Sequence, residues 1–537
     1  MRAPALLPIG YASMNTRLEF LIDHVWQNAT LTPDREALVL EDVRLTWRET
    51  ADLVNGCAMA MLASGVVRGA RIAMLSTPRP EYVVVMMAAL KVGAIWLGLN
   101  PRHTARELRF IIGDSKPMLV FSLGLRDGRN YLDDLDEIRS EAGPFQLVAL
   151  TGERGSAELT MEEFLQRRKN VTPGELDARA AANRPGDPAV IVYTSGTTGE
   201  PKGALLSQAG FLDSYRVQAA LWKAEPLRII NNMPISHIGG IGDITAYATI
   251  SGGTMVFMER FDPVRLLDTV NKERISVLGQ VTAMYQKIVD CEAWRSADLS
   301  SLQLLWWAGS EAPLSLVEEL GKRVQKTVTY YGMTELTGSV SYVNNDQPLE
   351  VKARTIGHPR PEFELRLAND AGEPAMPGAS GEIQARGKNV FLGYWNRELE
   401  TKTAFTGDGW FKTGDIGRIR EDGNWEVVGR LKEMFKSGGY NVYPREIEQV
   451  IESHPDVESA CLLALPDPQW QEIGWAFVRP KSAGGLDTVA MASFLRQQLA
   501  GYKLPKRIIL VAEWPVTASG KIDKAALRDQ AESLRLH

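Results

Sequence analysis

The sequence contains very little cysteine. Three of its 537 residues are cysteines, and they lie far apart, at Cys57, Cys291 and Cys461. This separation excludes the close ligand spacing of a zinc site and the dense disulfide framework of small secreted proteins. We therefore expect a protein of a reducing compartment, with a cytoplasmic location.

An excess of one charge and a long apolar run are also missing. Sixty Lys and Arg against 66 Asp and Glu give a net charge of −6, which disfavours general nucleic-acid binding. The apolar run in residues 1–8 is short and contains prolines, so it does not fit a signal peptide. The apolar stretch 82–99 is interrupted by Lys91, which predicts a buried helix and strand and no membrane span.

Short apolar runs alternate with stretches of helical periodicity through most of the chain. The expected strands include 71–75, 117–121, 145–150, 276–278 and 302–307, and the helical stretches include 81–91 and 314–323. Such alternation predicts an α/β fold of layered subdomains whose sheets are mainly parallel.

The pattern changes in the last third of the chain. After about residue 361, glycines and prolines separate short strands, which predicts a β-rich subdomain. Beyond Gly429 we expect a compact α+β segment with helices 444–452 and 490–499 and strands 459–465, 474–478 and 507–511.

The segment YTSGTTGEPKG, residues 193–203, has the composition of a phosphate-binding loop. Glycines let backbone N–H groups converge on an anion, hydroxyls add donors and a lysine adds positive charge. The residues expected to bind phosphate are Thr194, Ser195, Gly196, Thr197, Thr198, Gly199 and Lys202. A Walker A loop is excluded, because Pro201 interrupts that pattern and residues 203–207 look like a strand.

Six further motifs follow this loop along the chain. They are 309–313 (GSEAP), 330–335 (YYGMTE), 381–395, 410–415 (WFKTGD), 429–432 (GRLK) and 515–521 (PVTASGK). In this order they resemble the motifs of the adenylate-forming enzymes, which comprise acyl- and aryl-CoA synthetases, adenylation domains and luciferases. The pattern is most similar to that of the acyl-CoA ligases.

The resemblance implies a two-step reaction and a two-domain chain. A small carboxylic acid and ATP would give an acyl-adenylate and pyrophosphate, and coenzyme A would then give acyl-CoA and AMP, with Mg²⁺ as the metal. The large N-terminal domain would span residues 1–430. A small mobile domain, residues 431–537, would rotate about a hinge at Lys432.

The resemblance also assigns roles to individual residues. Besides the loop, the nucleotide would contact Gly309, Ser310, Glu311, Ala312, Pro313, Tyr330, Tyr331, Gly332, Met333, Asp415 and Arg430. Tyr331 would stack on adenine, and Asp415 would accept both ribose hydroxyls. Thr334 would contact the α-phosphate, and Glu335 would hold Mg²⁺, a hard cation that takes oxygen ligands. After rotation, the thiol arm of coenzyme A would meet Lys436, Ser437, Gly438, Gly439 and Tyr440.

The acyl substrate is expected beside His237, which matches the family's gate position next to the acyl carbonyl. Its expected neighbours are Ile238, Gly239, Met284, Trp307 and Met333. This set is apolar and contains no Lys or Arg, so it favours a bulky hydrophobic acid of the aryl, alicyclic or medium-chain type. An inward-pointing Asp243 would contradict this interpretation. Ser236 stands where the family usually has an aromatic residue.

Two alternatives stay open at this point. An adenylating enzyme could deliver its product to a carrier protein, and a non-catalytic relative could bind nucleotide as a sensor. The second alternative predicts loss of Lys202, Glu335, Asp415 or Lys521, and the sequence retains all four. The resemblance further allows a homodimer, and it makes Lys521 a candidate substrate of a lysine acetyltransferase.

Replacing Lys521 by Ala should nearly abolish adenylation but spare thioester formation. By resemblance, this lysine bridges the attacking carboxylate and the α-phosphate, and loss of such a donor costs on the order of 10²–10³ in rate. The measurement is the rate of each half-reaction, with acid and ATP or with a supplied acyl-adenylate and coenzyme A. Equal loss of both steps would show that Lys521 is not the adenylation lysine.

Overall fold

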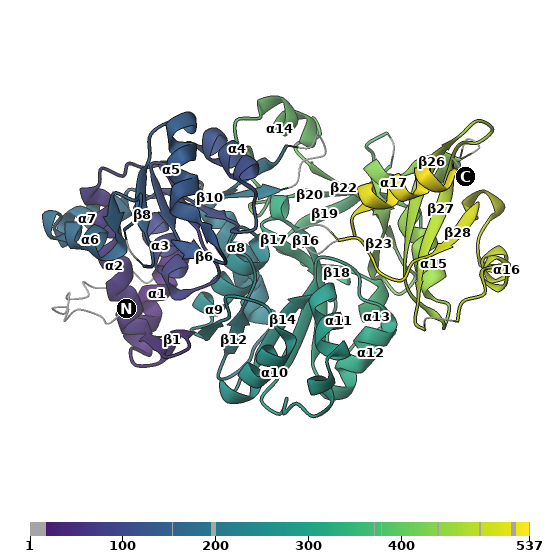
Figure 1. Cartoon of the computed structure of the whole chain (residues 1–537), viewed down its shortest axis with the longest axis horizontal. Coiled ribbons are helices and arrows are strands. Elements are labelled where there is room, and N and C mark those ends of the chain that lie inside the picture. The colour runs from purple at the N-terminus through teal and green to yellow at the C-terminus, as the bar shows by residue number, and fades with distance from the viewer. Residues whose placement is uncertain are drawn as a thin grey trace.

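The computed structural model describes residues 18–152, 154–194, 200–369, 371–376, 378–437, 440–482, 485–516 and 522–535. Ser195–Gly199 of the expected phosphate loop, Gly438, Gly439 and Lys521 lie outside these ranges. Most of the described chain forms two large sheets with helices, and its last hundred residues form a smaller unit beside them (Figure 1).

The first large sheet has nine strands, and its centre is parallel. In spatial order these are β18 (His358–Pro359), β17 (Gly338–Tyr342), β16 (Thr327–Met333), β15 (Leu304–Ala308), β14 (Val277–Val281), β12 (Arg228–Asn231), β13 (Thr254–Phe257), β1 (Glu36–Leu40) and β2 (Val43–Thr46). The outer pairs β16–β17, β17–β18 and β1–β2 are antiparallel.

The second large sheet has eight strands and a parallel centre as well. Its spatial order is β21 (Gly393–Tyr394), β11 (Lys202–Ser207), β10 (Pro188–Thr194), β4 (Ile95–Leu99), β3 (Arg71–Leu75), β5 (Leu119–Ser122), β8 (Gln146–Ala149) and β9 (Leu159–Thr160). Strand β11 pairs antiparallel with β10, so the prediction that residues 203–207 form a strand is confirmed.

A central helical layer is shared by the two sheets. It holds α1 (Leu21–Leu31), α2 (Trp47–Ala63), α3 (Pro80–Lys91), α8 (Gln208–Leu221), the π-helix η2 (Gly239–Ala246) and α9 (Tyr247–Ile250), whose apolar residues join one core with residues of both sheets. All twelve residues of α3 are buried, as expected for a helix covered on every side. Helix α6 (Met161–Gln166), η1 (Arg167–Asn170) and α7 (Pro173–Ala181) contact α2.

The outer faces of both sheets carry further helices. Helices α10 (Pro263–Lys272), α11 (Thr282–Asp290), η3 (Glu292–Arg295), α12 (Leu314–Arg323) and α13 (Leu349–Arg354) share a core with the nine-stranded sheet. Helices α4 (Ala105–Ser115) and α5 (Tyr131–Ala142) share one with the eight-stranded sheet, next to the hairpin β6 (Leu125–Arg126) and β7 (Arg129–Asn130). The predicted layered α/β fold is therefore confirmed.

The β-rich segment expected after residue 361 is a four-stranded antiparallel sheet. It consists of β19 (Glu364–Ala368), β20 (Gly381–Arg386), β22 (Phe411–Ile419) and β23 (Trp425–Arg430), with α14 (Glu398–Ala404) inserted before β22. The turn η5 (Leu431–Glu433) then leads into the last unit.

The last unit is the predicted α+β segment. Its elements are β24 (Phe435–Ser437), β25 (Tyr440–Val442), α15 (Pro444–Glu452), β26 (Val457–Asp467), β27 (Gln471–Pro480), α16 (Thr488–Gln498), η6 (Gly501–Lys503), β28 (Arg507–Leu510) and α17 (Lys524–Arg535). The buried apolar residues here form two clusters that contain no described residue before Phe435. These separate cores support a domain boundary near residue 431, which stays a prediction.

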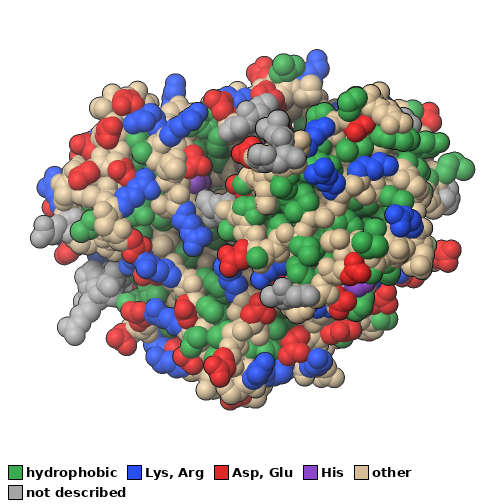
Figure 2. Space-filling model, turned by 45° about the vertical axis from the view of Figure 1, so that its right-hand side comes forward, with side chains coloured by type: hydrophobic (Ala, Val, Ile, Leu, Met, Phe, Trp, Pro, Cys, Tyr) green, Lys and Arg blue, Asp and Glu red, His purple; other side chains and the backbone are tan. Residues whose placement is uncertain are grey.

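Charges of both signs are interspersed on the surface (Figure 2). The face in view carries Lys and Arg side chains among Asp and Glu, as a net charge near zero for this length suggests. Within the described ranges, no helix has both the length and the apolar character that a bilayer crossing demands.

An aromatic cluster lies between the nine-stranded sheet and α8. Trp222 stacks on Trp306 with ring centroids 5.7 Å apart, and Tyr330 lies 5.5 Å from Trp222. Gly279 of β14 makes room for this arrangement, because a methyl group at that position would lie 1.9 Å from Cε2 of Trp306. A side chain at Gly279 would therefore displace the indole.

Replacing Gly279 by Ala should destabilise the protein, because overpacking a core costs about 1–3 kcal/mol. The matched control is Gly174→Ala in α7, where an added methyl group meets no atom within 4 Å. Calorimetry should show a fall of about 1–3 °C in apparent melting temperature for the first variant, because the shift per kcal/mol is small in a chain of this length. An equal melting temperature for both variants would contradict the described packing.

Candidate functional site

The candidate site lies where neighbouring parallel strands end. Strands β12, β14, β15 and β16 run parallel in one sheet, so their carboxyl ends meet at one edge. The segments that follow them contain His237, Met284, Gly309–Pro313 and Thr334–Glu335 in that order. The fold thus brings together residues spread over about a hundred positions of sequence.

The second sheet reaches the same place through Tyr394 of β21. The Nζ atom of Lys202 lies 5.5 Å from the centre of the Tyr394 ring, a cation–π contact. The Tyr394 hydroxyl donates to Oε1 of Glu335 at 3.0 Å. Lys202, from the expected phosphate loop, and Glu335, the expected metal ligand, therefore flank one tyrosine.

Glu335 is half-buried, and burial raises the pKa of its carboxyl group. The hydrogen bond from Tyr394 and the positive charge of Arg430 act in the opposite direction. A divalent cation would remove the cost of keeping this carboxylate ionised. Because Mg²⁺ commonly binds one or two carboxylates together with phosphate oxygens and water, Glu335 fits such an ion.

Asp415 is held by two neighbours. It pairs with Arg430 in the register of β22 and β23, and Nε of Arg430 lies 2.9 Å from Oδ1. The Tyr331 hydroxyl donates to Oδ2 at 2.8 Å. The ion pair with Arg430 does not have hydrogen-bond geometry. The buried Oδ1 can therefore still accept a hydrogen bond.

Burial and these neighbours act in opposite directions on the pKa of Asp415. Its side chain is 3% exposed, and burial raises the pKa of the carboxyl group. Arg430, Tyr331 and Lys432 favour the ionised form. A carboxylate has about four lone-pair positions, so two contacts leave capacity for two more donors, as a pair of vicinal hydroxyls would require.

His237 is exposed and lies at the start of the segment that becomes η2. The Gly239 backbone N–H donates to Nδ1 of His237 at 3.1 Å. Ile238 and Gly239 are buried, and Met284 and Met333 are half-buried near the strand ends.

Trp307, expected beside the acyl group, lies on the opposite face of the nine-stranded sheet. Its side chain belongs to the core with α10–α12, whereas Trp306 belongs to the central layer. Alternation along β15 separates the two indoles. The structure therefore does not bring Trp307 together with His237, and it places Trp306 on the side of η2.

Asp243, whose inward orientation would contradict a purely apolar acyl site, lies in the buried central layer. Asp243 of η2 is 4% exposed and accepts a hydrogen bond from the Tyr330 hydroxyl at 2.5 Å. The surroundings of the expected acyl site are therefore not purely apolar. The only sequence signal was the presence of an acidic residue within an otherwise apolar segment.

The residues expected to meet coenzyme A lie in the last unit. Lys436 is exposed and Ser437 is buried on β24, and the exposed Tyr440 stacks on Tyr502 with ring centroids 4.5 Å apart. Lys432 is an exposed residue of η5.

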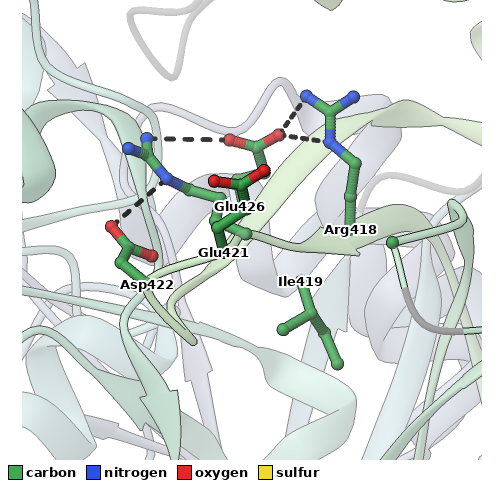
Figure 3. A pocket seen from close by; sticks show the side chains of 7 residues that line it. Arg418, Ile419, Glu421, Asp422 and Glu426 are labelled. Carbon is green, nitrogen blue, oxygen red and sulfur yellow. Dashed lines mark hydrogen bonds and ion pairs between the residues drawn. The ribbon is translucent and has the colours of Figure 1, made fainter.

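A surface hollow of about 630 Å³ lies apart from these residues, on the hairpin of β22 and β23 (Figure 3). Arg418 pairs with Glu426 at 2.5 Å, and Arg420 pairs with Asp422 at 3.4 Å. The residues that line it include none of those expected to bind the nucleotide or the acid. We do not assign it to the site.

The last unit contacts the site through Glu311, part of the segment expected to hold adenine. Arg445 of α15 donates to its Oε2 at 2.7 Å through Nη2, and Gln449 donates to Oε1 at 2.9 Å. Arg445 also pairs with Glu448 and Glu452 of its own helix. One carboxylate of the large unit therefore joins a charged cluster of the small one.

Comparisons with known proteins agree with this geometry. The model of the AMP-binding enzyme family matches residues 25–395, and that of the AMP-binding enzyme C-terminal domain matches residues 446–521. The chain therefore belongs to the AMP-binding enzyme family, and the resemblance drawn from its motifs is confirmed.

Individual relatives are similar over nearly their whole length. The chain is 33% identical to the indoleacetate–CoA ligase of Aromatoleum aromaticum, covering 95% of this chain and 97% of that protein. It is 34% identical to a feruloyl-CoA synthase of Amycolatopsis, covering 94% and 97%. The crystal structure of ATP-bound MatB from Rhodopseudomonas palustris is 25% identical with a TM-score of 0.82, covering 96% and 99%. The chain is accordingly an enzyme of the acyl-CoA synthetase type.

Replacing Glu311 by Ala should loosen the small unit, because it removes the charge-assisted contacts of Arg445 and Gln449 described above. Losing such contacts costs on the order of 1–2 kcal/mol. Limited proteolysis around residues 431–433 should become several-fold faster, and small-angle scattering should show a larger radius of gyration. The control is Glu318→Ala, which removes an exposed glutamate of α12. Equal cleavage of both variants would argue against the contact.

Proposed function

We propose that the protein is an ATP-dependent carboxylic acid–CoA ligase. In the first step, an oxygen of the acid attacks the α-phosphate of ATP and pyrophosphate leaves. In the second step, the thiol of coenzyme A attacks the acyl carbon and AMP leaves. The observation that carries the proposal is the convergence of Lys202, Glu335 and Asp415 on one edge of the fold.

The three residues suit the first step because both reactants are anionic. Lys202 and the backbone of its loop would hold the outer phosphates, and Asp415 would accept the ribose hydroxyls. Thr334, buried beside Glu335, would contact the α-phosphate. When bound at Glu335, Mg²⁺ would supply charge neutralisation for the triphosphate. Fixing both reactants in line is the main source of rate in such transfers.

The second step would require the small unit to turn about Lys432. In the described orientation, Tyr440 is exposed and stacks within its own unit. Rotation would bring Lys436–Tyr440 to the site and take Lys521 away from it. The same site could then serve both steps, and the acyl-adenylate would be kept from water between them.

The acid is proposed to be hydrophobic and to carry a ring. The named relatives act on indoleacetate and on a feruloyl group, both of which join a carboxylate to an aromatic ring by a short chain. Tyr330, whose hydroxyl contacts Asp243, and Trp306 beside it would supply aromatic surface to the acyl group. Alicyclic and medium-chain acids would fit apolar walls of this kind as well.

The test is chromatography of a reaction that contains an acid, ATP, Mg²⁺ and coenzyme A, run over a panel of hydrophobic acids. Acyl-CoA, AMP and pyrophosphate should appear in equal amounts. Accumulation of an adenylate that coenzyme A does not consume would favour transfer to a carrier protein. No turnover of any acid would contradict the proposal.

The matched variant is Asp415→Ala. It should raise the KM for ATP and lower kcat/KM at least about tenfold, because the loss of a hydrogen bond to a charged group costs about 1.5–3 kcal/mol. The KM for the acid should change less. Unchanged ATP kinetics would show that Asp415 does not hold the ribose.

A further inference from the structure

The central layer contains a buried carboxyl group with one unused oxygen. Asp243 is 4% exposed, its Oδ2 accepts from the Tyr330 hydroxyl, and its Oδ1 has no hydrogen-bond partner among the described residues. Buried polar atoms nearly always have partners, because an unpaired one loses its hydration without compensation. Oδ1 therefore needs a donor that the described chain does not supply.

A second unpaired group lies next to Asp243. The Tyr215 hydroxyl of α8 is fully buried and also has no hydrogen-bond partner within the part of the chain that the structure describes. It points between two glycines: a methyl group would lie 1.8 Å from it at Gly242 and 2.6 Å from it at Gly338. Gly242 precedes Asp243 in η2, so the bare backbone lets the phenol approach that carboxyl group.

Further polar groups of α8 belong to the same region. Gln218 donates through Nε2 to the backbone oxygen of Asp243 at 2.8 Å, while its Oε1 has no partner. Among the described residues, Tyr215 and Gln218 of α8 thus both bring polar atoms without partners to η2.

This set of polar side chains lies close to the expected reaction centre. A methyl group at Gly239 would lie 3.3 Å from Nδ1 of His237 and 3.7 Å from Oδ2 of Asp243. The Asp243 carboxyl group and the His237 ring therefore both lie next to Gly239, which has no side chain to stand between them. His237 is the histidine expected beside the acyl carbonyl. Trp306 and Tyr330, with ring centroids 5.7 Å apart, flank the region with aromatic surface.

We propose that Asp243, supported by Tyr330 and Tyr215, forms a polar end of the acyl site and selects acids whose ring carries a hydrogen-bond donor. This inference rests on the proposed ligase function and names the substrate class more closely. A hydroxyl or N–H group on the ring would donate to Oδ1 of Asp243. A hydroxyl could in addition accept from Tyr215.

The chemistry of Asp243 favours a donor. Burial raises the pKa of its carboxyl group to about 7, and the hydrogen bond from Tyr330 opposes that rise. An ionised carboxylate only accepts hydrogen bonds, whereas the protonated acid both donates and accepts. In both states an oxygen is free to accept, so a ring-borne donor is satisfied and an unsubstituted ring leaves that oxygen unpaired.

The experiment compares matched acids with the full-length enzyme. The series is 3-phenylpropanoate, its 3-hydroxy and 4-hydroxy derivatives, and the 4-methoxy derivative, which has a similar size but no donor. A parallel series uses 3-cyclohexylpropanoate and its 4-hydroxy derivative. In at least one series, kcat/KM for a hydroxylated acid should exceed that of its unsubstituted and methoxy analogues by about tenfold or more.

Two variants locate the effect. Asp243→Ala should bring the ratio of kcat/KM between hydroxylated and unsubstituted acids close to one. Asp243→Asn, which keeps one acceptor oxygen, should retain part of the preference. A ratio is insensitive to partial loss of folded enzyme, so a stability defect alone does not change it.

The outcomes separate this inference from the proposed function. Turnover of the acids with no preference for a donor in the unmodified enzyme would overturn the role of Asp243 and leave the ligase function standing. A preference that persists in Asp243→Ala would assign the selection to another residue and overturn it as well. Failure to convert any acid of these series or of the wider hydrophobic panel would contradict the proposed function itself.

Discussion

The arrangement of the whole large unit depends on one shared layer of buried helices. Helix α3 is buried on every side because helices α1 and α2 pack against it and strands of both sheets, β1 and β4, contact it. Burial of this much apolar surface, worth roughly 25 cal/mol for each Å², leaves the two sheets little freedom to slide. As a result, β11 of one sheet stays in contact with η4 (Thr334–Leu336), which follows β16 of the other sheet. The contact of Tyr394 with both Lys202 and Glu335 is a consequence of that packing.

Three carboxyl groups at the candidate site each accept a hydrogen bond from a tyrosine hydroxyl. Tyr394 donates to Glu335, Tyr331 to Asp415 and Tyr330 to Asp243. Burial raises the pKa of all three carboxyl groups. A phenol is a neutral donor, so it steadies a buried carboxylate without cancelling its charge. In the function we propose, acceptor oxygens are left for a cation at Glu335, for ribose hydroxyls at Asp415 beside Arg430 and, by our further inference, for a ring-borne donor at Asp243.

The sequence predicted the architecture better than the lining of the site. Helices α12 and α15 begin and end where periodicity placed them, and the expected strands appear within a few residues, because a buried face imposes a period on the chain. The Trp306–Trp307 pair shows the limit. Both faces of β15 are covered, so both indoles are buried, and alternation alone cannot tell which one faces η2. The phase of the π-helix is equally invisible in GGIGDITA, which is why the orientation of Asp243 had to come from the structure.

The contact between the two units can open without leaving a buried charged side chain unpaired. Arg445 pairs with Glu311 across the interface and with Glu448 and Glu452 inside its own helix. In the rotation that we propose for the second step, Arg445 would keep its two carboxylate partners, and Glu311 would stay on a loop that water can reach. The large penalty of a broken buried ion pair comes from leaving one charge uncompensated, and this cluster avoids it on both sides. A reaction that needs two orientations of the same small domain requires such a contact, strong enough to favour one orientation and weak enough to exchange.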